Sequence, residues 1–205
     1  MTKKYIIKGL VQGIGYRPFV AKIADELNID GWVRNTGGIV TVMASGEEDN
    51  LQSFYDRLSD DIPTGGFISS IEIESVSDFD AGNADKRDTS MFSNQGSEII
   101  SGTGFRIVDS DQDVELNLPL IPADIASCDE CKKELLNKDN RRYLHPFISC
   151  TVCGPRYSII KKLPYDRDTI TMGDFGMCEI CHTEYTAKLD RRRHAQTIAC
   201  KQCGP

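Results

Sequence analysis

Eight cysteines are the residues of this sequence whose type and spacing most directly predict a chemistry. They form four C-x-x-C pairs, grouped two by two, with eighteen residues between the two pairs of a group. A thiolate pair at this spacing can direct both sulfurs at one ion, and two such pairs complete a tetrahedron. We therefore predict two structural zinc sites. The candidate ligands are Cys128, Cys131, Cys150, Cys153, Cys178, Cys181, Cys200 and Cys203.

The two groups of cysteines look like copies of one module. Every cysteine of the first group recurs fifty residues later, and the same offset relates Arg141 to Arg191, which indicates an internal duplication. The simplest arrangement gives each copy its own ion, although a pairing of the outer C-x-x-C pairs with each other stays open. His145 and His194 lie near the second pair of each copy and could replace a cysteine. Otherwise we expect both histidines on the surface.

A site with four sulfur ligands leaves no position for water, so these sites are predicted to stabilise the fold rather than to catalyse. Thiol redox chemistry and a secreted disulfide framework are the alternatives. We expect no signal peptide, because Lys8 interrupts the short apolar run at 5–7. Nor does any stretch approach the roughly 18 apolar residues of a membrane span. We expect a cytoplasmic protein.

The net charge of −7 conceals a difference between the two parts of the chain. Residues 124–205 hold 14 Lys and Arg against 11 Asp and Glu, a net of +3, which leaves −10 for residues 1–123. This basic part, with arginines at 141–142 and 191–193, would suit a non-catalytic zinc-binding adaptor for nucleic acid or protein. Each filled four-cysteine site carries about −2, however, so two sites bring this part to about −1. The charge argument for nucleic acid is then largely lost.

A second candidate site lies at residues 9–17, a glycine-rich segment before a predicted helix. Gly13 and Gly15 allow successive backbone N–H groups to converge, and the helix N-terminus adds positive potential. Arg17 stands where a guanidinium could hold a phosphate through two hydrogen bonds. The alternative is a tight turn followed by a surface arginine, and the loop alone leaves both interpretations open.

Apolar periodicity predicts the elements that would position this loop. Helices are predicted at 17–28 and 48–58, each with an apolar stripe, as in Phe19, Ile23 and Leu27. Strands are predicted at 5–11, 31–35, 39–44 and 69–79, with a possible edge strand at 105–108. The order βαββαβ predicts an α+β domain in which both helices pack on one face of a four-stranded antiparallel sheet, the ferredoxin-like arrangement.

The distribution of cysteines divides the chain, because all eight follow residue 127. Residues 80–102 are polar and contain few large apolar side chains, which predicts a mobile insertion. We expect a ferredoxin-like domain at 1–110, a linker at 111–123, a first zinc module at 124–155, a connector at 156–173 and a second zinc module at 174–205.

The segments 11–20 and 31–35 closely resemble the acylphosphatase pattern, with Ile14 and Tyr16 as mild variants. That family has the ferredoxin-like fold inferred above. The resemblance implies two catalytic residues, Arg17 to hold the phosphate and Asn35 to orient the attacking water. The phosphate cradle that it implies consists of backbone amides of Gln12, Gly13, Ile14, Gly15, Tyr16 and Arg17.

An acylphosphatase domain followed by this cysteine duplication resembles the N-terminal part of the HypF family, the carbamoyltransferases that help to mature nickel–iron hydrogenases. Matching segments of the cysteine-rich part are 141–143, 146–156, 164–167 and 190–192. The resemblance implies that the first domain hydrolyses carbamoyl phosphate to carbamate. Later domains would use ATP to transfer the carbamoyl group to a HypE-type maturation protein, where it becomes a cyanide ligand of iron.

The YrdC-like and Kae1-like domains of that family are absent from these 205 residues. The resemblance therefore implies a piece of a longer protein that should not carry out the complete transfer. From the charge and the lack of long apolar stretches we expect no nucleic acid and no membrane as partners. If the two parts of the chain fold independently, zinc-depleted protein should keep its acyl phosphate hydrolysis.

Overall fold

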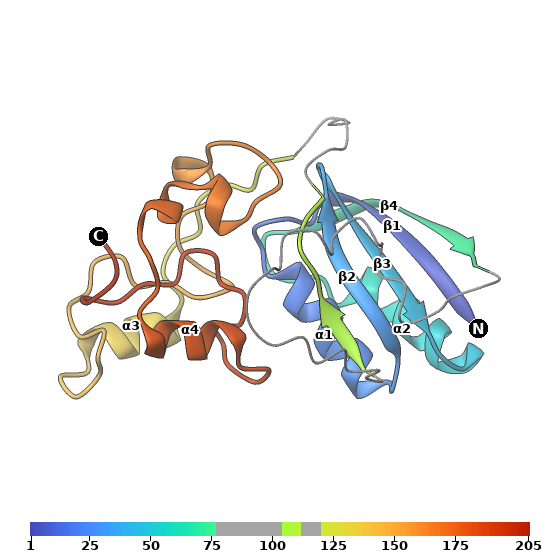
Figure 1. Ribbon diagram of the computed structural model, residues 1–205, viewed down its shortest axis with the longest axis horizontal. Helices are drawn as coiled ribbons and strands as arrows, with labels where there is room; N and C mark the ends of the chain where they lie inside the picture. The colour runs from blue at the N-terminus through green and yellow to red at the C-terminus, as the bar shows by residue number, and fades with distance from the viewer. Residues whose placement is uncertain (77–103, 112–119) are drawn as a thin grey trace, which may run out of the picture.

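The computed structural model describes residues 1–76, 104–111 and 120–205 of the chain. Figure 1 shows two adjacent bodies, which we name the sheet half (described residues 1–111) and the cysteine half (120–205). The predicted insertion at 80–102 and most of the predicted linker at 111–123 lie outside the described residues. No helix in the described ranges is long and apolar enough to cross a membrane.

The sheet half follows the predicted order and adds a fifth strand. Its elements are β1 (Thr2–Leu10), α1 (Tyr16–Glu26), β2 (Asp30–Thr36), β3 (Ile39–Ser45), α2 (Glu48–Asp60), β4 (Phe67–Ser75) and β5 (Phe105–Ile107). The strands lie in the order β4-β1-β3-β2-β5. The first four pair antiparallel, whereas β5 pairs parallel to β2 at the edge. The α+β prediction with a ferredoxin-like sheet is thus confirmed, and the possible strand at 105–108 is present.

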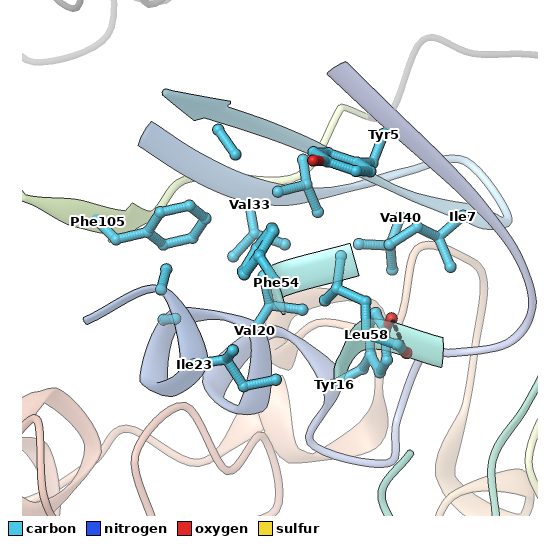
Figure 2. Packing of buried hydrophobic residues seen from close by; sticks show 14 of the residues in the cluster. Tyr5, Ile7, Tyr16, Val20, Ile23, Val33, Val40, Phe54, Leu58 and Phe105 are labelled. Carbon is cyan, nitrogen blue, oxygen red and sulfur yellow. Dashed lines mark hydrogen bonds between the residues drawn. The ribbon is translucent and has the colours of Figure 1, made fainter. Parts of the chain in front are cut away.

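The core lies between one face of this sheet and the two helices, because alternate strand positions and one stripe of each helix are apolar (Figure 2). Tyr5 of β1 packs edge-on against Phe54 of α2, with ring centroids 5.7 Å apart. The Tyr16 hydroxyl, in the first turn of α1, donates a 3.1 Å hydrogen bond to the Leu58 carbonyl of α2. This buried contact fixes the start of α1 and therefore the loop that precedes it.

The cysteine half repeats its backbone as well as its sequence. Its helices are α3 (Asp129–Leu136) and α4 (Glu179–Thr186), with three short 3₁₀ turns between them, η2 (Tyr157–Ile159), η3 (Arg167–Thr169) and η4 (Thr171–Asp174). Cys128 and Cys178 precede the two helices with the same φ of −70° and ψ of 163°. Leu144 and His194, fifty residues apart, are both left-handed, at φ of 51° and 52°. The duplication seen in the sequence is therefore also a structural one.

Candidate active site and metal centres

The loop between β1 and α1 has two features that the predicted anion cradle requires, left-handed glycines and a helix N-terminus. Gly13 and Gly15 have φ of +71° and +79°, a region that glycine occupies without steric cost. Gly15 is also the N-cap of α1, whose first turn carries no acidic side chain. Because the first N–H groups of a helix have no intrahelical partner, they can bind an anion at this end.

The side chain of Gln12 holds this loop in place from two sides. Its Nε2 donates hydrogen bonds to the carbonyls of Gly37 (2.8 Å) and Ile39 (3.0 Å), in the turn between β2 and β3. Its Oε1 accepts a 3.1 Å hydrogen bond from the backbone N–H of Tyr165 in the cysteine half. The cradle is therefore attached both to its own sheet and to the neighbouring half.

Arg17 and Asn35 line one small cavity together with the loop. Arg17 lies in the first turn of α1, and Asn35 lies near the end of β2. Asn35 is 1% exposed, and its Oδ1 accepts no hydrogen bond from any described residue. A buried oxygen without a donor is unfavourable, so this position suits a bound water or a substrate group. The cavity volume of about 30 Å³ has room for about two water molecules.

A carboxylate from the cysteine half contacts the arginine of this site. Arg17 Nη2 donates to Asp166 Oδ1 at 2.5 Å, and Arg17 Nη1 donates to Ser110 Oγ at 3.2 Å. Ser110 Oγ donates in turn to the other carboxylate oxygen of Asp166. The Arg17 side chain is 10% exposed and that of Asp166 is 17% exposed, so the three groups form an enclosed cluster.

Arg156 links the cradle to the first group of cysteines. Its guanidinium, 2% exposed, donates from Nε to the Gly13 carbonyl. It also donates from Nη1 to the Cys153 carbonyl (3.1 Å) and from Nη2 to the Thr151 carbonyl (2.9 Å). The two halves therefore share the site, so the first group of cysteines is in contact with the cradle through Arg156, and whether zinc-depleted protein keeps its activity stays a prediction.

His194 and Tyr165 of the cysteine half also line the cavity. Burial, together with the charges of Arg17 and Arg193, lowers the pKa of His194 to about 4. Burial raises the pKa of Tyr165 to about 12. At neutral pH the imidazole is therefore uncharged and the phenol is protonated, so the positive charge beside the cradle comes from arginine.

The eight cysteines gather into two clusters, one for each copy. The first cluster contains Cys128, Cys131, Cys150 and Cys153, and the second contains Cys178, Cys181, Cys200 and Cys203. Neighbouring Sγ atoms are 3.5–3.7 Å apart in the first cluster and 3.6–3.8 Å apart in the second. A disulfide would require about 2.05 Å.

The sulfur positions fit a tetrahedral metal ion. Four sulfurs 2.3 Å from a central zinc lie about 3.8 Å from each other, close to the distances found in both clusters. Neither His145 nor His194 belongs to a cluster. The expectation that both histidines lie on the surface is wrong, since His145 is 1% exposed and His194 is half-buried against Tyr185.

Each cluster is contacted by an arginine of the other copy. Arg141 donates to the sulfurs of Cys200 (3.0 Å), Cys178 (3.3 Å) and Cys181 (3.4 Å). In the mirror contact, Arg191 donates to the sulfurs of the first cluster, at 3.0 and 3.4 Å. Charge on the sulfurs raises the pKa of both guanidinium groups, although burial opposes it.

The neighbouring arginines cross between the copies as well. Arg142 pairs with Glu184 of α4, and Arg192 pairs with Glu134 of α3. Burial acts to raise the pKa of both carboxyl groups, but the arginine hydrogen bonds and charges outweigh it and lower both pKa values. Because Arg142 is 2% and Arg192 is 3% exposed, the arginines that suggested an adaptor for nucleic acid are largely engaged inside this half.

The structure brings the predicted loop, Arg17 and Asn35 together at one cavity, and it adds two contacts that sequence reasoning did not name, Asp166 and Arg156. Nothing in the spacing of the chain points to these two, which lie 149 and 143 residues from their partners in the loop. One signal was available, since both residues fall inside segments that match the HypF pattern.

Two family models match the chain. The acylphosphatase model matches residues 3–83, and the HypF finger model matches residues 128–160 and 177–205. The HypF finger match and the two four-cysteine clusters together indicate metal binding.

Individual relatives combine both parts. A probable carbamoyltransferase HypF of Methanocaldococcus jannaschii is 39% identical over 82% of this chain and 19% of its own length. A crystal structure of full-length HypF in a phosphate- and nucleotide-bound form superposes with a TM-score of 0.81, is 34% identical, and is matched over 99% of this chain and 24% of that one. An acylphosphatase of Caldivirga maquilingensis is 36% identical over 35% of this chain and 76% of its own length. The chain thus spans about a fifth of the length of the curated HypF relatives it matches.

Proposed function

This chain belongs to the HypF carbamoyltransferase family, with an acylphosphatase domain followed by paired HypF fingers, and from this premise we propose that its sheet half hydrolyses carbamoyl phosphate. The family is one of hydrolases and transferases. The observation that carries the proposal is that Arg17 and Asn35 line the same small cavity as the left-handed glycine loop.

In the proposed reaction a water oxygen attacks phosphorus, the bond from phosphorus to the carbamoyl oxygen breaks, and carbamate leaves with that electron pair. Arg17 and the loop amides would stabilise charge on the phosphoryl oxygens, as preorganised donors do. The unpartnered Oδ1 of Asn35 would accept a hydrogen bond from the attacking water and hold it in line. No general base is required, because the acyl leaving group is already a good one.

We propose further that each four-cysteine cluster binds one structural zinc ion, with the ligands that the sulfur positions define. The carbamate would then serve ATP-dependent carbamoyl transfer to a HypE-type maturation protein, the source of iron cyanide ligands. We assign neither of these later steps to residues of this chain. A cytoplasmic location stays a prediction.

The test is an assay of phosphate release from carbamoyl phosphate and from benzoyl phosphate. Arg17→Ala should lower kcat at least hundredfold, the effect of removing one donor that acts on transition-state charge. Arg57→Ala, in the last turn of α2, removes a partly exposed arginine outside the cavity whose ion-pair partners among the described residues are Glu26 and Asp61, and it should keep full activity. Full turnover by Arg17→Ala would refute the assignment.

A further inference from the structure

We propose that Asp166, supplied by the cysteine half, is a positioning residue of the hydrolytic site that fixes the guanidinium of Arg17 beside the cradle. The inference rests on the proposed function and adds to it. It starts from the 2.5 Å ion pair between Arg17 Nη2 and Asp166 Oδ1, with Ser110 bonded to both partners.

The enclosure of this ion pair makes it stronger and more fixed than an exposed one. An exposed ion pair is weak because water screens it and both side chains move. Here both side chains are more than four-fifths covered, so the attraction is stronger than at a surface. An arginine side chain also loses much rotamer freedom when it is fixed, and Asp166 fixes it before any substrate arrives.

The contact leaves Arg17 free to act on a phosphoryl group. A guanidinium has five N–H donors in one plane. Asp166 and Ser110 take one each, from Nη2 and Nη1. With respect to the described residues, three donors are left on a residue that lines the cavity, and bidentate recognition of a phosphate needs two.

The backbone of Asp166 is itself held in a short hydrogen-bonded turn. The backbone N–H of Asp166 donates to Thr169 Oγ1 at 2.9 Å, and Thr169 Oγ1 donates to the Pro164 carbonyl at 2.5 Å. Thr169 is fully buried. Because this turn lies in the chain between the two groups of cysteines, the folded cysteine half determines the position of the carboxylate.

A competing role would have the opposite kinetic sign. If Asp166 occupied Arg17 in place of the substrate anion, its neutralisation would lower KM and leave kcat unchanged. If Asp166 orients Arg17, its neutralisation lowers kcat, because the contact of the arginine with the phosphoryl group is strongest in the transition state.

The experiment measures kcat and KM for carbamoyl phosphate with Asp166→Asn, which keeps the shape and removes the charge. Asp174→Asn is the matched control, since the Asp174 side chain is 71% exposed in the same half. We expect kcat to fall ten- to hundredfold in Asp166→Asn, with KM within threefold, and no change in the control. An unchanged kcat, with or without a lower KM, overturns the inference.

A second measurement separates this inference from the proposed function. The Arg17 Nε–H resonance, assigned by its loss in Arg17→Lys, should be sharp in the wild-type protein, broadened in Asp166→Asn and unchanged in Asp174→Asn. If the wild-type protein hydrolyses no acyl phosphate, the proposed function fails while this resonance still decides whether Asp166 holds Arg17. A resonance that is unaffected by Asp166→Asn overturns the inference on its own.

Discussion

Removing the charge of Arg141 should lower the metal affinity of the second cysteine cluster, although Arg141 belongs to the first copy. The guanidinium lies 3.0–3.4 Å from three sulfurs of the second cluster. A divalent ion with four thiolates carries a net charge of −2, which the adjacent cation offsets. Arg141→Gln should therefore lower the metal affinity of the second cluster and leave that of the first unchanged.

The magnitude follows from the contact distances. A unit charge pair 4 Å apart attracts by about 4 kcal/mol at an effective dielectric constant of 20. Arg141 is 26% exposed in its side chain, so it also loses part of its hydration, and the net value is smaller. Loss of an outer-shell partner typically costs 10–100-fold in metal affinity, or about 1.4–2.8 kcal/mol. We expect a weakening in this range at the second cluster.

The assay is chelator competition on zinc-loaded protein, followed by alkylation of released cysteines and peptide mass spectrometry. Alkylation should appear first at Cys178 and Cys181 in Arg141→Gln, and at Cys128 and Cys131 in the mirror variant Arg191→Gln. Arg141→Lys retains the charge and should lie between Arg141→Gln and wild type. Early alkylation within the mutated copy, or equal alkylation of both copies, would refute the crossed arrangement.

Two further predictions concern the shared site. Chelation of the metal should lower the rate of carbamoyl phosphate hydrolysis at least tenfold, and added zinc should restore it. The reason is that Arg156 hydrogen-bonds both to the cradle and to the Cys153 and Thr151 carbonyls of the first cysteine group. Full activity of the metal-free protein would contradict this. The His194 pKa of about 4 lies below the 6.5 of an unfolded histidine, so between these values the unfolded chain binds a proton that the folded chain does not. The free energy of unfolding therefore decreases as pH falls from about 6.5 towards 4, by up to about 3 kcal/mol. His194→Asn tolerates the left-handed backbone and should lose less stability than wild type between pH 7 and 4.5, as measured by urea midpoints; equal losses would contradict the assignment.

Local patterns carried enough information to predict the elements and the grouping of the cysteines. The helices and strands follow from apolar periodicity, and the grouping of sulfurs follows from the short reach of C-x-x-C pairs. The direction of the arginine contacts could not be predicted in this way. Glu134 and Arg141 both recur at the same fifty-residue offset. Contacts of the arginines within their own copy and contacts between copies would therefore give the same sequence pattern.

Contacts over long separations were likewise out of reach of local patterns. The pair of Arg17 with Asp166 depends on how two separately recognisable parts dock, and no periodicity encodes docking. The burial of His145 depends on the same kind of packing, since the histidine lies in a loop without regular periodicity, and spacing alone does not show which of its side chains turn inward. Composition was misleading too, because the arginines that gave the cysteine half its basic charge lie against its own sulfurs and carboxylates.

The glycines of the cradle show why the fold and the site cannot be separated. Their positive φ angles suit the loop that we propose binds an anion. A methyl group added at Gly15, however, would lie 2.3 Å from Thr151 Cγ2, and one added at Gly13 would lie 2.9 Å from Pro122 Cγ. The same two residues therefore let the amides converge and let the cysteine half approach closely. A side chain at either position would disturb both, so the close approach that brings Asp166 to Arg17 is built into the sequence that forms the cradle.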